Sequence, residues 1–264
     1  YVGIKYDILQ SKAHILILRR YRWVIRDRKK YQFDLIGDNS FSTFLSQYYY
    51  SKPSVPRFIY VNEEPDSKEA LEKSLEKNAS HRVNIITVSN RIDIERKQLM
   101  DLIVRNLSTY ISKGFEPSLL GLKKTLNLKA LPKVIDCFDV SNLGLSIAVG
   151  SCVRFVNGIP EKSFYRKFKI KSVKDQNDFA MINEIVSRRY SKEDKLNLPD
   201  LVLIDGGKGQ LKSAVEATSK LDLKIQCISI AKEREEIFVP FSSAPIVIPK
   251  SNKSLKILQY LRDE

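Results

Sequence analysis

The segment that most restricts the fold is the apolar run Leu201–Ile204, which ends at Asp205 and is followed at once by glycines. Its residues are apolar without alternation, which is typical of a strand buried on both faces. Such strands lie in sheets that helices cover on both sides, and helical patterns flank the run at Asp178–Tyr190 and Gln210–Leu221. The sequence therefore predicts an α/β domain around this strand.

Short strands joined by turns precede that run. The predicted strands are Val134–Asp139, Ile147–Phe155 and Ser163–Ile170, with turns at Asn142–Gly144 and Asn157–Gly158. After the run we predict strands Ile225–Ile230 and Glu236–Val239 and a helix from Lys253 to Arg262. A hairpin meander followed by alternating helix and strand matches the RNase H-like fold, in which both sections form one mixed sheet.

The first half predicts a similar order of elements. The predicted strands are Val2–Ile8, Ala13–Leu18, Tyr21–Ile25, Lys30–Ile36, Arg57–Val61 and Val83–Val88, and the predicted helices are Phe41–Tyr50, capped within Asp38–Ser40, Ser67–Asn78 and Ile92–Ser112. Residues 113–133 contain Gly114, Pro117, Gly121 and Pro132 and are predicted to connect two domains, 1–133 and 134–264. We infer two RNase H-like units in tandem from element order alone, and two unrelated α/β domains are the alternative.

Two aspartates end predicted strands of the second half. Alternation puts Asp139 on a buried face with Cys137, where an ionised carboxylate is costly unless it is paired or binds a cation. Asp205 ends the next apolar strand, and functional groups of α/β sheets gather at the carboxyl ends of strands. If the two strands are neighbours, the carboxylates converge and predict a Mg²⁺ site suited to phosphoryl transfer. Asp178, at the head of its helix, is a candidate third ligand or a simple N-cap.

The glycines 206, 207 and 209 do not form a nucleotide-binding P-loop, because GxxxxGK[ST] is absent. They would allow a phosphate to approach the backbone, with Lys208 adding a positive charge. Arg188 and Arg189 are a second candidate phosphate contact, and an exposed helix end is the alternative reading.

The net charge of +14 favours a polyanionic partner, with nucleic acid first and an acidic membrane surface second. Residues 1–133 hold most of the excess, with 24 Lys and Arg against 14 Asp and Glu. Three cysteines in apolar, strand-like settings suit a reducing cytoplasm, and no apolar run is long enough for a transmembrane helix.

Several stretches resemble the C-terminal endonuclease half of the UvrC family. They are Cys137–Ser141, Tyr165–Phe168, Asp178–Met181, Arg188–Tyr190, Leu201–Leu211, Ala231–Lys232, Glu235–Pro240 and Leu261–Glu264. The resemblance covers residues 134–264 in register and extends more weakly over residues 1–133.

This resemblance implies an RNase H-like endonuclease that cuts the damaged strand 5′ of a lesion, using Mg²⁺ or Mn²⁺. It implies damaged double-stranded DNA as a partner and a UvrB–DNA complex as another, the latter through family segments absent here, and no membrane. Asp139 and Asp205 match the metal-binding catalytic aspartates, and Asp178 matches a further functional carboxylate. The predicted DNA-binding residues are Lys167, Lys208, Arg188 and Arg189.

The sequence departs from the family pattern in two places. The family's catalytic histidine lies just beyond an Arg-Asp-Glu motif, here Arg262–Glu264, and the family has Ser-His where this chain has Ser141–Asn142. We therefore expect this fragment to bind metal and DNA and to cut little. The first half offers Asp7 and Asn62 near the positions of Asp139 and Asp205, which predicts a catalytically degenerate unit.

Two other functional classes fit the same sequence. One is a non-enzymatic module that grips DNA or a repair partner, which the basic first half favours. The other keeps the fold and acts on RNA or an RNA–DNA hybrid.

Overall fold

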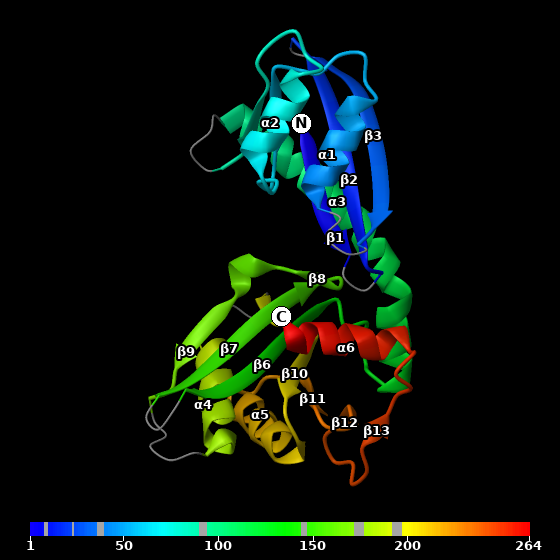
Figure 1. Cartoon of the computed structure of the whole chain (residues 1–264). Coiled ribbons are helices and arrows are strands. Elements are labelled where there is room, and N and C mark those ends of the chain that lie inside the picture. Colours follow the sequence, from blue (N-terminus) through cyan, green and yellow to red (C-terminus); the bar gives the residue numbers. More distant parts are fainter. Residues whose placement is uncertain are drawn as a thin grey trace. The chain divides into compact units, whose positions relative to one another are not determined.

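Each half of the chain is built around its own mixed sheet in the computed structural model, which describes residues 1–7, 10–22, 24–35, 40–89, 94–143, 147–171, 177–191 and 197–264. The two units are Tyr1–Lys113 and Gly114–Glu264 (Figure 1). Among the described helices, none has the length and apolar composition needed to cross a bilayer.

The first unit has a five-stranded sheet in the order β3-β2-β1-β4-β5. Its strands are β1 Val2–Asp7, β2 Lys12–Tyr21, β3 Val24–Asp34, β4 Phe58–Val61 and β5 Asn84–Thr87, and its helices are α1 Phe41–Tyr50, α2 Lys68–Glu76 and α3 Ile94–Thr125, which runs on past the unit. The first three strands are antiparallel, whereas β4 is parallel to β1 and to β5.

The central strand β2 shows why this sheet is covered on both sides. Ile15 and Ile17 belong to one buried cluster with residues of α1 and α2. Leu16 and Leu18 belong to another with Ile103 of α3. Successive side chains of a strand point to opposite faces of the sheet, so burying all of them requires a helix layer on each face.

The second unit has an eight-stranded sheet in the order β13-β12-β11-β10-β6-β7-β8, with β9 also paired to β7. Its strands are β6 Val134–Leu143, β7 Ile147–Val156, β8 Ile159–Pro160, β9 Arg166–Lys169, β10 Leu201–Asp205, β11 Gln226–Ala231, β12 Glu236–Phe238 and β13 Ile246–Val247, and its α-helices beyond α3 are α4 Asp178–Tyr190, α5 Lys208–Lys220 and α6 Lys253–Asp263. β6, β10 and β11 run parallel, and β6 pairs antiparallel with β7.

The strand β10 is buried over its whole length, as predicted. Val202 and Ile204 pack in one cluster with Ile185 of α4 and Leu211 of α5. The opposite face is reached by α6, whose Tyr260 ring meets Phe155 of β7 edge-on with a centroid separation of 5.2 Å. Figure 1 shows α4 and α5 together and α6 apart from them. The two faces of this sheet therefore meet different helices.

The predicted connector at residues 113–133 is helical over its first part, where α3 continues through Gly114 and Pro117 to Thr125. Its buried residues include Ile111, Phe115, Leu119 and Leu122, which share one face of the helix. Each such side chain contributes about 1.5–3 kcal/mol on burial, whereas an internal proline costs about 3 kcal/mol. Packing therefore outweighs the local signals, and the division between the units falls inside this helix.

The predicted order of a hairpin meander followed by alternating helix and strand is present in both units. Ser40 caps α1 as predicted, its side chain accepting a hydrogen bond from the Thr43 backbone at 3.4 Å. Asp38, Asn39, Ile92 and the Gly144 turn position lie outside the described residues.

Candidate functional site

The two aspartates predicted to converge lie on neighbouring parallel strands. Ile204 of β10 is in register with Phe138 of β6, so the next positions, Asp205 and Asp139, lie side by side. Asp205 ends β10, whereas β6 continues past the predicted end at Asp139 to Leu143. Alternation places Asp139 on the same face as Cys137, and Leu203 beside Cys137 places Asp205 there too. This is also the face of Phe155, which α6 covers.

The Asp205 carboxylate is nearly enclosed, with the residue 7% exposed. Burial raises its pKa above the ordinary value, and the negative charge of Asp139 raises it further. The Nζ of Lys232 lies 2.7 Å from Asp205 Oδ2 and opposes this shift. Asp139 Oδ2 accepts a hydrogen bond from Ser141 Oγ at 2.9 Å. The site is thus a pair of carboxylates, one of which is ion-paired with a lysine.

Sequence reasoning did not assign Lys232 to the site. It follows Ala231 at the end of β11, the strand beside β10, and therefore reaches Asp205. A second residue, Arg262 of α6, pairs with Glu235 at 2.8 Å and lowers the pKa of Asp205 through its charge. The sequence signals for Lys232 were its place just after an apolar strand and the resemblance of Ala231–Lys232 to the UvrC family.

The donor chemistry of Asp139 and Asp205 fits a hard divalent cation, because Mg²⁺ and Mn²⁺ take carboxylate oxygens and keep positions for water and phosphate. In the part of the chain that the structure describes, no group of three or more His, Cys, Asp or Glu side chains could hold a metal ion. Asp178 therefore does not join Asp139 and Asp205 in one group of candidate ligands. Asp178 is the first residue of α4, and the N-cap is Asn177, whose Oδ1 accepts from the Ala180 backbone at 3.1 Å.

The glycine loop after Asp205 has three different environments. Gly206 has φ +153° and faces the Gln210 side chain, and a Cβ on Gly209 would collide with the Phe179 ring. Gly207, the N-cap of α5, has open space where a Cβ would lie. Its backbone N–H donates to Gln210 Oε1 at 2.8 Å. With exposed Lys208 opening a helix of 13 residues, this loop has the character of an anion site.

Changing these glycines to alanine should separate their roles. We expect Gly206→Ala to lower the free energy of unfolding by more than about 1 kcal/mol, since alanine is strained at that φ and meets Gln210. Gly207→Ala should change it by less than about 0.5 kcal/mol. Urea unfolding of both variants checks this, and equal losses would contradict the assignment.

The predicted DNA-binding residues differ in exposure. Lys208 and Lys167 are exposed, Lys167 on the edge strand β9. Arg188 donates from Nη1 to the Lys169 carbonyl and to Glu184 Oε1, both at 2.8 Å, and so ties α4 to β9. Arg189 is only 7% exposed, with Nε 3.7 Å from Asp136 Oδ2. The burial of Arg189 does not favour a contact between this residue and DNA. That contact stays a prediction.

A buried charge cluster lies on the other face of the same sheet. Asp136 is fully buried and accepts from Arg154 Nε at 2.6 Å and Nη2 at 2.8 Å. The hydroxyl of Tyr190 donates to its Oδ2 at 2.9 Å. Burial, with Asp136 next in effect, raises the pKa of Tyr190 well above its ordinary value. This aspartate is three residues from Asp139 and serves the fold, because its oxygens are bonded to buried side chains.

The raised pKa of Asp205 predicts the effect of removing its charge. A carboxyl with a raised folded-state pKa favours the fold when protonated, so its destabilising contribution is absent at low pH and grows as pH rises through the folded pKa. Without added metal, we expect Asp205→Asn to have a higher Tm than the parent at pH 7 and an equal one near pH 3. Lys232, 66% exposed, stays solvated in the variant. Thermal unfolding at both pH values checks this, and a lower Tm at pH 7 would contradict it.

Two family models match the chain. The UvrC RNAse H endonuclease domain model matches residues 123–264, and the UvrC Ribonuclease H-like domain model matches residues 2–113. Both halves thus match an RNase H-like model, which confirms the predicted fold of two such units in tandem.

Curated relatives agree with these models. The chain is 43% identical over 265 residues to the UvrABC system protein C of Methanococcus maripaludis, covering 96% of this chain and 49% of that protein. For the same protein of Methanosarcina barkeri the identity is 39% over 264 residues, covering 99% and 49%. The chain spans about half the length of these two relatives. A solved endonuclease V of Ciona intestinalis bound to inosine-containing DNA is 15% identical with TM-score 0.32, covering 60% of this chain and 88% of that one, a likeness too low to bear on activity.

Proposed function

The chain belongs to the UvrC family of the UvrABC excision nuclease, and on this basis we propose that its second unit is the metal-dependent endonuclease that makes the 5′ incision in the damaged strand during nucleotide excision repair. The observation that carries the proposal is the pair Asp139 and Asp205, which lie side by side on the neighbouring parallel strands β6 and β10. Two carboxylates brought together at an enclosed strand end are poorly stable unless a cation lies between them.

Asp139 and Asp205 would hold Mg²⁺ or Mn²⁺ by one or more oxygens each. When bound, such a cation neutralises charge on the scissile phosphate and helps to generate the attacking hydroxide from water. Ser141 orients Asp139 through its hydrogen bond of 2.9 Å. Lys232 holds one oxygen of Asp205 and places its positive charge at the site entrance, since its side chain is 66% exposed. Asp178 is proposed as a further functional carboxylate at the head of α4.

The DNA backbone would contact the glycine loop and the edge strand β9. Gly207 leaves space for a phosphate at the start of α5, and Lys208 adds charge there. Lys167 extends the basic surface along β9, where Arg166 and Lys169 are also exposed. Such contacts position a strand without reading its bases, which suits a nuclease directed by partner proteins.

The first unit is proposed to be catalytically degenerate. Asn62 is committed to β1, accepting from the Ile4 N–H at 2.7 Å and donating to the Ile4 carbonyl at 2.9 Å. Asp7 is 2% exposed and faces His14, with 3.9 Å between Oδ2 and Nε2. Neither side chain is arranged as half of a carboxylate clamp.

The partners proposed are damaged double-stranded DNA and a UvrB–DNA complex, the latter through the half of its relatives' length that this chain does not span. An incision assay tests the substrate, using a protein that joins this chain to the remaining half found in its relatives. We expect Mg²⁺-dependent cutting 5′ of the lesion in damaged duplex with UvrB, and little in an RNA–DNA hybrid of equal length. Faster cutting of the hybrid would favour an RNA-directed enzyme instead.

A further inference from the structure

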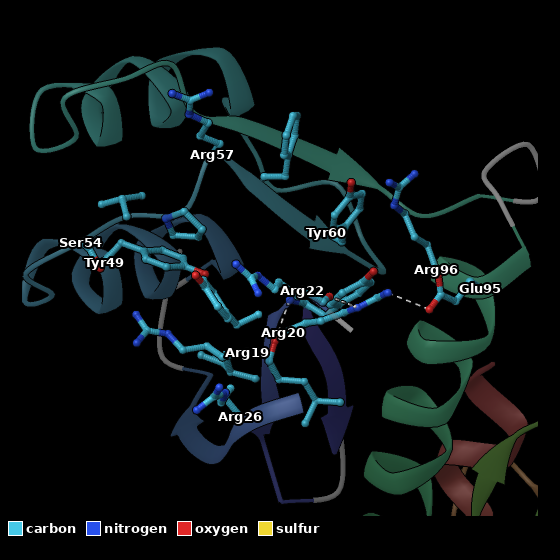
Figure 2. Close-up of a pocket in the computed structure, with 17 residues that line it drawn as sticks. Arg19, Arg20, Arg22, Arg26, Tyr49, Ser54, Arg57, Tyr60, Glu95 and Arg96 are labelled. Atoms are coloured by element: carbon cyan, nitrogen blue, oxygen red, sulfur yellow. Dashed lines mark hydrogen bonds and ion pairs between the residues drawn. The ribbon is translucent and has the colours of Figure 1, made fainter. Parts of the chain in front are cut away.

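The first unit contains an open cavity of about 800 Å³ whose walls are unusually rich in arginine. Six arginines line it: Arg19, Arg20, Arg22, Arg26, Arg57 and Arg96. Glu95 is the single acid among the described lining residues. In Figure 2, Arg57 lies next to β4 and Arg96 on α3, and Arg19, Arg22 and Arg26 lie across from them on the β2–β3 hairpin. The residues that line the cavity therefore carry a large net positive charge.

The local backbone brings several of these arginines together at one end of the β2–β3 pair. The β2–β3 pairing shifts register between Arg19 and Arg20, and Arg22 turns the chain with φ +54°. Arg20 is held in place, with Nη2 2.8 Å from Glu95 Oε1 and Nε donating to the Arg22 carbonyl at 2.9 Å. Arg19, Arg22, Arg26, Arg57 and Arg96 all have exposed side chains. Arg20 is thus held by hydrogen bonds, whereas the other five arginines have exposed side chains.

Aromatic rings lie between these charges. Tyr21 is 61% exposed, and the guanidinium carbons of Arg22 and Arg26 lie 5.7 and 5.9 Å from its ring centroid. Phe58 is 53% exposed and stacks on Tyr60, whose ring also lies 5.1 Å from the Arg96 guanidinium carbon. Large exposed rings gain little from packing on the protein, so they are available to an external flat group.

Arginines interleaved with exposed aromatic rings suit single-stranded nucleic acid. Guanidinium groups pair with phosphates in bidentate geometry and stay charged at any physiological pH. Aromatic faces stack on bases, which are accessible only when the strand is unpaired. A duplex would offer the phosphates and not the base faces, and an acidic peptide would leave Tyr21 and Phe58 without partners.

We propose that this cavity binds a single-stranded segment of DNA. The site lies in the unit that lacks the carboxylate pair, so it is separate from the incision chemistry and goes beyond the proposed nuclease. It would hold an unpaired strand by its phosphates and stack one or more of its bases on Tyr21 and Phe58.

The test measures fluorescence anisotropy of a labelled oligothymidine of about 12 nucleotides, a length typical of such sites, with the intact 264-residue chain in EDTA. We expect the double variant Arg22→Gln, Arg57→Gln to weaken binding about tenfold or more and to reduce the salt slope by roughly 1.4, or about 0.7 for each lost phosphate contact. Phe58→Ala should weaken binding about fivefold or more.

The matched control is Arg82→Gln, Arg105→Gln, which removes the same charge from two exposed arginines outside the cavity. It should weaken binding less than about threefold. Equal losses in the two double variants, or tighter cavity-dependent binding of duplex DNA or polyglutamate, would overturn the proposal.

A second readout does not depend on variant stability. Ultraviolet crosslinking of the oligonucleotide to the unaltered chain, mapped by mass spectrometry, should label Tyr21 or Phe58. Labels confined to the second unit would overturn the proposal. Asp139→Asn should bind the oligonucleotide as the parent does, so failure of the nuclease assignment and failure of this site are separate outcomes.

Discussion

Asp139→Asn and Asp205→Asn should each reduce metal-dependent incision by about a thousandfold or more while leaving DNA affinity nearly unchanged. Each removes one charged oxygen ligand from the carboxylate pair, and the stabilisation that a bound cation gives the reacting phosphate is several kcal/mol, with 1.36 kcal/mol for each tenfold in rate. The measurement is incision of lesion-containing duplex DNA, in a protein that joins this chain to the remaining half found in its relatives.

The matched control is Asp222→Asn in the same unit. Asp222 is exposed beyond α5 and has φ +53°, a conformation that asparagine adopts readily. It should cut at the parental rate. Full incision activity in Asp139→Asn or Asp205→Asn would remove the basis for the assignment.

The second large effect concerns stability, at a carboxylate only three residues from Asp139. Asp136→Asn should lower the free energy of unfolding of the second unit by about 3–5 kcal/mol, because removing one partner of a buried ion pair leaves the opposite charge uncompensated. The fully buried Asp136 receives two hydrogen bonds from Arg154 and one from Tyr190, and Arg189 lies 3.7 Å away.

Hydrogen exchange of peptides from β6, β7 and β10 reports this loss for the second unit alone. Asp139→Asn is the matched comparison on the same strand and should exchange nearly as slowly as the parent. A loss below about 1 kcal/mol in Asp136→Asn would contradict the structural role of the buried cluster.

Much of the fold follows from local patterns in the sequence. The unbroken apolar run of β10 required helices on both faces, and the alternating segments predicted the hairpins of both units. The continuation of α3 could not be predicted, because Gly114 and Pro117 signal a break and the compensating burial of Phe115 and Leu119 depends on tertiary packing.

The candidate site, like the fold, could be predicted only in part. The pairing of Asp139 with Asp205 could be predicted, because both aspartates follow apolar runs and the two strands are parallel neighbours. The continuation of β6 past Asp139 to Leu143 was not predicted. Lys232 could not, since its contact with Asp205 depends on β11 lying next to β10. The burial of Arg189 could not be predicted either. Adjacent helix residues point about 100° apart, and the packing of α4 on the sheet decides whether Arg188 or Arg189 is buried.

Calorimetric titration of the chain with Mn²⁺ tests the carboxylate pair most directly. We expect Mn²⁺ to bind the parent chain and the Asp222→Asn variant. We expect this binding to be lost in both Asp139→Asn and Asp205→Asn. Mn²⁺ binding of undiminished affinity in the Asp139→Asn chain would contradict a metal site formed by these two aspartates.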